Sequence, residues 1–559
     1  MTATPIQTGP RAPAQVMRLD RLGASFPTRL SFMRVLLRRL MAEKTTVTRP
    51  VWQIDDQGFG RAVYTLTLGG FTYSLVAFST PLAPENRTDR VIAEAWDTSY
   101  VLFDGIPASA DLDRLQTNAP KQEAGRFTSK ELVLCRANKS VRMFDHVVDC
   151  LAKGEQPAAD QVQSVGYLMR TTAVYGNGKF GIADRALFAG RPGLGGPFAA
   201  EMLAVWLVRA FTLDLVEHVA HQKGGAAFVP LDAHLKRHFG VGNATGLGMA
   251  PFLVSHPVLL NNWIAARETA LARVSACKAA TADEIAATLS LIARASRHLA
   301  QWNVADSLQM GRITDLRREW AAIAETVNTN WLTKDHPWQR LQALADKKSL
   351  ECQELMVALL LEPHGDLVDD LAGDMATDTR GGFDTALTVG AMRALLEAHF
   401  DWALSVDFSD PLQLQQFWYV SVEKLEPRLG DRYGEAGSEL ESPLDIARRA
   451  QALAQDFNLA NPVETLAEFL LRHPDHRFLA RRVQLAAQYP YSELRDNLIA
   501  DTCLPIDMLR CKLAFFGASK FDPKSDRWTR ITMYQGAPLT EDIAGAKDDW
   551  WLPVLRGVQ

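Results

Sequence analysis

The sequence predicts a mainly α-helical protein, in which a large multi-helix body carries a small antiparallel β meander near the N-terminus, an α+β arrangement. Apolar residues recur at helical spacing through most of the chain after residue 129, often with proline in the first turn. Before that point, segments 48–54, 61–68 and 71–78 are short, rich in Val, Tyr, Thr and Phe, and separated by glycines. Glycines that separate short runs of this composition are typical of strands that pair in chain order.

A helix expected at 29–42 precedes the three strands. The secondary structure of segment 87–105 is left unassigned, because a short apolar run fits a strand and a helix equally well. The remaining helices are expected, in chain order, at 129–151, 159–169, 197–221, 232–238, 251–277, in a series reaching about 327, and at 338–361, 389–404, 411–422, 443–457, 462–471 and 478–488. Residues 521–559 are expected to wrap back on the body through Trp550, Trp551 and Leu552.

The length of 559 residues exceeds what one hydrophobic core usually supports, so several units are expected. The acidic, glycine-bearing stretch 362–383 is the best candidate for a linker. The expected parts are a disordered tail at 1–15, an α+β subdomain at 16–128, a central helical domain with two glycine-bearing loops at 129–365, and a C-terminal helical domain with an irregular tail at 366–559.

Charge and cysteine usage exclude several classes of protein. The 60 basic and 65 acidic residues are mixed along the chain, so there is no overall positive charge of the kind that favours binding to nucleic acid. No stretch reaches the roughly 18 uninterrupted apolar residues of a membrane helix. The six cysteines form no CxxC pair, which argues against a zinc ribbon or a disulfide framework. We therefore expect a cytoplasmic protein with neither a nucleic-acid nor a membrane partner; its cofactors and oligomeric state stay unassigned.

The first glycine-bearing loop, 175–185, combines cations with groups that transfer protons. Arg170 and Arg185 can bind a carboxylate or phosphate bidentately, and Asn177 can add a hydrogen bond. Tyr175 and Lys179 are the candidate catalytic residues, because either can exchange a proton if its pKa is lowered. In the alternative interpretation, Asp184 pairs with one of the arginines and only holds the loop in place.

The second glycine-bearing loop, 240–251, precedes a helix expected to begin at Pro251. Free backbone amides at a helix start can hold an anion, and Asn243, Thr245 and Gly246 are the candidate binding residues. His256 follows about one turn later and is a third candidate catalytic residue. The alternatives are a plain helix connector with glycines at positive φ and a structural histidine. The dinucleotide fingerprint is absent, because the preceding segment looks helical rather than like a strand.

Three further clusters are interpreted as structural. Asp214, Glu217, His218 and His221 lie on one side of a helix but lack the HExxH order, so we assign no metal ligands. The arginines of helix 29–42 are interpreted as a solvated face. Cys511 lies among apolar residues, as a packing cysteine does.

The P-loop, nucleophile-elbow, HExxH, kinase and EF-hand signatures are all absent. The best hypothesis is an enzyme of lyase or hydrolase type that acts on a small anionic metabolite, a carboxylate or a phosphate. Two alternatives stay open. One is a nucleotide- or dinucleotide-dependent enzyme that holds phosphate at 240–248, and the other is a non-catalytic helical interaction scaffold.

Overall fold

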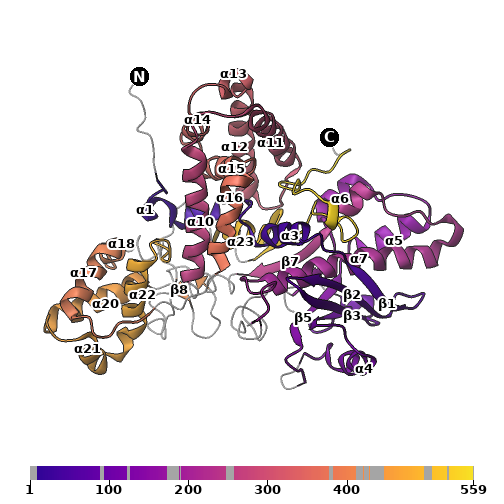
Figure 1. The fold of residues 1–559 in the computed structure, drawn as a ribbon, viewed down its shortest axis with the longest axis horizontal. Helices are drawn as coiled ribbons and strands as arrows, with labels where there is room; N and C mark the ends of the chain where they lie inside the picture. The colour runs from indigo at the N-terminus through magenta and orange to yellow at the C-terminus, as the bar shows by residue number, and fades with distance from the viewer. Residues whose placement is uncertain are drawn as a thin grey trace.

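The computed structural model describes residues 9–87, 93–122, 126–172, 188, 190–246, 257–376, 382–410, 419–420, 427–428, 446–495, 507–525 and 528–557. About half of the structure is helical, and the helices surround a nine-stranded mixed sheet (Figure 1). The prediction of a mainly α protein with a small N-terminal meander is therefore wrong. The three N-terminal strands are present, but they form only one end of a sheet that gathers strands from the whole chain.

The strand order in the sheet is β1-β2-β3-β4-β5-β6-β7-β11-β10. Every neighbouring pair is antiparallel except β6 and β7, which run parallel. The strand bounds are β1 (Thr48–Ile54), β2 (Gly60–Leu68), β3 (Phe71–Ser79), β4 (Thr98–Asp104), β5 (Glu131–Lys139), β6 (Tyr167–Thr171), β7 (Gly240–Gly246), β10 (Lys520–Ser525) and β11 (Trp528–Met533).

Strand β5 and the first three residues of β6 lie in segments that the sequence predicts to be helical. Nearly every residue of both strands is buried, so neither face of the sheet is open to solvent there. A strand buried on both faces carries a continuous apolar run without alternation, so its sequence looks like that of a buried helix.

Helix α7 (Ala199–Gly224) crosses one face of the sheet and contacts strands β2 to β7. It is buried for most of its length, and α5 (Phe144–Ala152) packs against it. On the other face, α4 (Ser109–Asn118) covers a smaller apolar cluster that includes Val76 and Val101. None of the helices in the described ranges is long and apolar enough to cross a membrane.

A stack of helices stands beside the sheet and shares its main core, which runs from Val16 to Met375 and resumes from Tyr491 to Leu555 (Figure 1). The helices that contribute to this core, besides α5 and α7, are α1 (Pro13–Val16), α2 (Leu19–Gly23), α3 (Phe32–Ala42), α6 (Ala159–Val165), α8 (Ala233–His238), α10 (Pro257–Ser275), α11 (Ala282–Gln301), α12 (Ser307–Thr326), α13 (Thr329–Leu332), α14 (Pro337–Ala345), α15 (Leu350–Leu361), α16 (Gly365–Val368) and α23 (Asp507–Phe516).

Five of the described helices form a separate apolar core at one end of the molecule, which we call the 389–488 lobe (Figure 1). They are α17 (Val389–His399), α18 (Asp401–Leu404), α20 (Ile446–Leu459), α21 (Leu466–Arg472) and α22 (Arg477–Gln488). Val389, Phe400, Phe457 and Leu479 are among the residues buried in this core.

Buried ion pairs join the N-terminal helices to distant parts of the chain. Arg34 on α3 is buried and pairs with Glu362 at 2.6 Å and with Asp548 at 2.7 Å. Arg29 pairs with Asp369 at 2.5 Å. The interpretation of this helix face as solvated is therefore wrong. Its acidic partners lie hundreds of residues away in the sequence, so no local spacing could predict the pairing.

Candidate functional site

Most of the predicted site residues lie on two segments that the structure does not describe. Tyr175, Asn177, Lys179, Arg185 and His256 all fall outside the described residues. For these five, their roles in binding and catalysis remain predictions.

The structure brings Arg170 and Asn243 together, although they are far apart in the sequence. Arg170 lies on β6 opposite Gly242 of β7, the residue before Asn243. The side chains of Arg170 and Asn243 are both buried. Asn243 Nδ2 donates to the carbonyl oxygen of Thr171 at 2.8 Å. Its Oδ1 is buried and has no hydrogen-bond partner within the described part of the chain. Arg170 lies near the carboxyl end of β6, and Asn243 lies at the middle of β7.

Residues 240–246 form a strand, so the prediction of a glycine loop there is wrong. Thr245 and Gly246 pair with Thr529 and Trp528 of β11. The glycines serve close packing, since a Cβ at Gly242 would lie 2.8 Å from the ring of Tyr167. The helix start expected at Pro251 lies outside the described residues, and the described helix that follows is α10 (Pro257–Ser275). The structure therefore offers no glycine-loop helix start at 240–246 to bind an anion.

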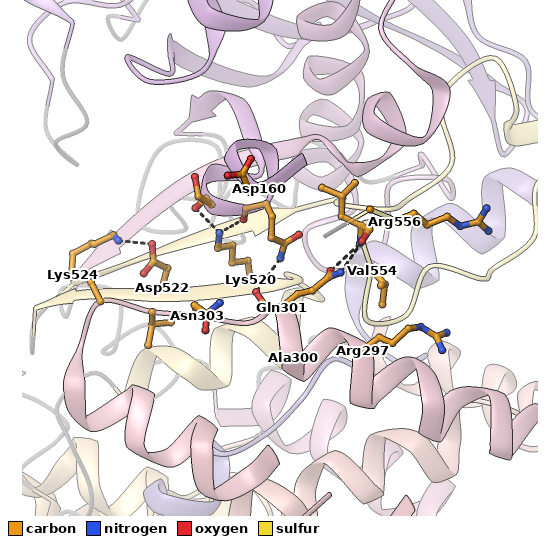
Figure 2. Close-up of a pocket in the computed structure, with 16 residues that line it drawn as sticks. Asp160, Arg297, Ala300, Gln301, Asn303, Lys520, Asp522, Lys524, Val554 and Arg556 are labelled. Carbon is orange, nitrogen blue, oxygen red and sulfur yellow. Dashed lines mark hydrogen bonds and ion pairs between the residues drawn. The ribbon is translucent and has the colours of Figure 1, made fainter. Parts of the chain in front are cut away.

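A cavity of about 710 Å³ opens where α6, the end of α11, β10 and the C-terminal segment meet (Figure 2). Four cationic side chains line it, along with two carboxylates and several apolar side chains. The cations are Arg297, Lys520, Lys524 and Arg556, the acids are Asp160 and Asp522, and the apolar residues include Val304, Val554 and Leu555. In Figure 2, the pair of Lys524 and Asp522 lies at one end, while Arg297 and Arg556 lie at the other.

Lys520 lies between these two ends of the cavity. Its Nζ donates to the carbonyl oxygens of Gln163 at 2.8 Å and Ser164 at 2.7 Å. Because an ammonium group has three donors, one N–H is left for a ligand. Burial lowers the pKa of Lys520 to about 8, with a further contribution from neighbouring cations such as Lys524. Lys520 can therefore change its protonation state near neutral pH.

A second cavity of about 230 Å³ adjoins the first and shares Arg297, Val554 and Arg556 with it. Its other lining residues include Arg237, Arg294, Asp549, His234 and His238. Arg237 forms an ion pair with Asp549, and Arg294 donates to the backbone oxygen of Trp551 at 3.2 Å. Counting both cavities, six Lys and Arg side chains face three carboxylates. This local excess of positive charge contrasts with the net charge of −5 of the whole chain.

Arg297 and Arg556 lie at the junction of the two cavities, and both are exposed. Neither guanidinium group has an ion-pair or hydrogen-bond partner among the described residues. The other two arginines of the cavities are bound to backbone or carboxylate oxygens, as described above. Arg297 and Arg556 are therefore the cations best placed to bind a ligand.

Buried contacts hold the C-terminal segment that carries Arg556. Gln301 Nε2 donates to the carbonyl of Leu555 at 2.7 Å, and the Leu555 amide donates back to Gln301 Oε1 at 3.0 Å. Trp551 Nε1 donates to the carbonyl of Pro27 at 2.9 Å. Trp550, Trp551 and Leu552 are all buried, so the prediction that the C-terminal segment packs back through them is confirmed.

Two buried histidines support the second cavity without adding charge at neutral pH. His238 Nε2 accepts a hydrogen bond from Gln535 Nε2 at 2.8 Å, and His298 Nδ1 donates to the carbonyl of Pro553 at 2.9 Å. Burial, helped by nearby cationic groups, lowers the pKa of His238 to about 3 and that of His298 to about 4. Both imidazoles are therefore neutral at pH 7.

Other candidate clusters from the sequence have structural roles. Asp214 accepts hydrogen bonds from Arg49 at 2.7 Å and from the Tyr64 hydroxyl at 2.6 Å, so it is not free to bind a metal. Cys511 is buried, and burial raises the pKa of its thiol to about 12. Such a thiol is not an activated nucleophile.

The cavity is the feature that the sequence analysis missed. Its charged side chains come from four separate segments, so they form no motif. In comparisons with known proteins, no family model, curated protein or solved structure matches the chain.

Proposed function

We propose that the protein binds a small carboxylate- or phosphate-bearing molecule in the joined cavities and acts on it as an enzyme of lyase or hydrolase type. The observation that carries this proposal is the pair Arg297 and Arg556 at the junction of the cavities, whose side chains have no partner among the described residues. An unbalanced group of cations in a concave, partly apolar site raises the local concentration of anions and favours their binding.

The side chains that line the cavities can form directed hydrogen bonds with an anion. Each guanidinium group can bind a carboxylate or phosphate bidentately. Lys520 supports this with the N–H that its two carbonyl partners leave over. The volume of about 710 Å³ falls within the usual range for small-molecule pockets. Val304, Val554 and Leu555 favour a ligand that also carries a short apolar part.

The proposed turnover rests on Lys520. Proton transfer by a side chain is most effective when its pKa lies near the working pH, and the pKa of Lys520 is about 8. Lyases and hydrolases both need such a group, to remove a proton from the substrate or from the attacking water. Tyr175, Lys179 and His256 remain predicted catalytic residues, and the binding proposal does not depend on them.

A thermal-shift screen against inorganic phosphate, pyrophosphate, succinate and citrate tests the binding proposal. A bound anion at about one hundred times its dissociation constant should stabilise the protein by roughly 2.7 kcal/mol. The shift should shrink in Arg297→Ala and Arg556→Ala. It should persist in Arg318→Ala, a control arginine that is 76% exposed on α12. An absence of any shift, or equal shifts in all variants, would contradict the proposal and favour a non-catalytic interaction scaffold.

A further inference from the structure

A cluster of metal-binding side chains lies in the 389–488 lobe, in a different part of the fold from the cavities (Figure 1). Asp456 comes from α20, His473 caps the end of α21, and His476 ends the short 3-10 helix η8 (Pro474–His476). We propose that these three residues form a binding site for a divalent transition metal ion such as Zn²⁺.

The distances between the three side chains support a shared ion. One ligand atom from each residue lies within 4.8 Å of the other two. Asp456 Oδ2 is 3.5 Å from His473 Nδ1, which matches the separation of roughly 3.4 Å between two donors on a tetrahedral zinc. Asp456 Oδ2 and His476 Nε2 are 2.6 Å apart and hydrogen-bonded, so they would have to separate by less than about 1 Å.

The two imidazole rings are oriented consistently with a common ion. Their centres are 6.1 Å apart and their planes differ by 28°. Two imidazoles bound to one zinc at about 2.0–2.1 Å place their ring centres roughly 5–6 Å apart, so binding would draw the two rings slightly closer together. The use of Nδ1 by one ring and Nε2 by the other is compatible with this, because either nitrogen of a neutral imidazole can bind a metal.

Packing against the core of the lobe holds the ligands in place. The ring of Phe469 stacks on His473 with centres 4.6 Å apart, and Phe469 itself packs on Phe457 at 4.8 Å. Pro474 restricts the backbone between the two histidines. Such support lowers the entropy lost when an ion orders the side chains.

The ligand set selects the class of ion. Two imidazole nitrogens and one carboxylate suit zinc, nickel, copper and iron, whereas calcium and magnesium prefer oxygen ligands alone. The side chains of His473, Asp456 and His476 are 38%, 35% and 13% exposed. An ion held there therefore stays open to solvent, with its remaining positions free for water or an external ligand.

Without an ion, the same residues are held by a hydrogen bond between Asp456 and His476. That hydrogen bond accounts for the position of the His476 side chain. It does not account for His473 Nδ1, which lies 3.5 Å from the same carboxylate oxygen. A metal site explains all three positions, because the ion replaces the hydrogen bond and draws in the second imidazole. Arg472 does not oppose the ion strongly, because it is paired with Glu464 at 2.6 Å.

Titration of the full-length protein with CoCl₂ and ZnCl₂, after treatment with a chelator and its removal, tests this proposal. We expect one ion per chain at this site, with visible absorption from bound Co²⁺ that Zn²⁺ displaces. Loss of an outer partner of a metal ligand costs roughly 10–100-fold in affinity, so loss of a ligand should cost at least tenfold. His473→Ala, His476→Ala and Asp456→Asn should each show this loss.

Asp475→Asn is the matched control, because Asp475 is an exposed acid between the two histidines and lies outside the cluster. Its affinity should equal that of the unaltered protein. Asp456→Asn keeps the shape of the side chain, so it tests the site even if an alanine variant fails to fold. The proposal is overturned if no ion binds, or if the Asp456→Asn variant and a His473→Ala/His476→Ala double variant bind the ion as the unaltered protein does.

Discussion

Lowering the pH should destabilise the protein through His238 and His298, the two buried histidines beside the cavities. Their pKa values of about 3 and about 4 in the folded state lie well below the ordinary value of 6.5. Below pH 6.5 the unfolded chain therefore binds protons that the folded chain does not, and stability falls with pH until the folded values are reached. Between pH 7.5 and pH 5, each histidine should lower the free energy of unfolding by about 2 kcal/mol.

Urea denaturation at the two pH values measures this effect. Two substitutions keep the hydrogen bonds but cannot titrate. Asn at 298 places an amide N–H near Nδ1, and Gln at 238 places an amide oxygen near Nε2. Each of His298→Asn and His238→Gln should reduce the difference in stability between pH 7.5 and pH 5 by about 2 kcal/mol, because all other titrating groups are unchanged. If the double variant shows the same difference as the unaltered protein, the assignment of neutral, buried histidines is wrong.

Three further predictions follow from buried or crowded groups. Binding of inorganic phosphate, measured by calorimetry, should weaken as the pH rises through about 8, because Lys520 then loses its charge, and Lys520→Met should remove that dependence. Glu362→Gln should lower the free energy of unfolding by about 3 kcal/mol in urea denaturation, because it removes one carboxylate from the buried Arg34. Gly242→Ala should lower the free energy of unfolding by about 1–3 kcal/mol in the same assay, because its Cβ would lie 2.8 Å from a tyrosine ring. Gly311→Ala on α12 is the control: its Cβ would meet no atom, so this variant should raise the free energy of unfolding by up to about 1 kcal/mol.

Local patterns predicted the elements whose signals are local. The strands at 48–79 were recognisable because glycines separate short runs of β-branched and aromatic residues. Segment 131–139 resembles a helix in sequence, because a strand buried on both faces has no alternation. Strands β10 and β11 pair with each other locally, but β11 joins the sheet through β7, which lies far away in the chain. Long-range pairing of this kind leaves no periodic signal in a single sequence.

The candidate site was predictable only in part. Arg170 and Asn243 are both predicted to bind the anion, and the structure places them on neighbouring strands. The cavity was not expected, because Arg297, Lys520 and Arg556 come from a helix end, a strand and the C-terminal segment. Electrostatic sites of this kind are formed by the fold and not by a motif.

Calorimetric titration with succinate and inorganic phosphate, at low ionic strength so that the charges are little screened, is the most direct test of the proposed anion site. The unaltered protein should bind one of these anions, and the Arg297→Ala/Arg556→Ala double variant should bind it at least one hundredfold more weakly, because each charged hydrogen-bonding group contributes about 1.5–3 kcal/mol. Arg318→Ala should bind as the unaltered protein does. Equal affinities for the double variant and the unaltered protein would contradict the assignment of these cavities as the site.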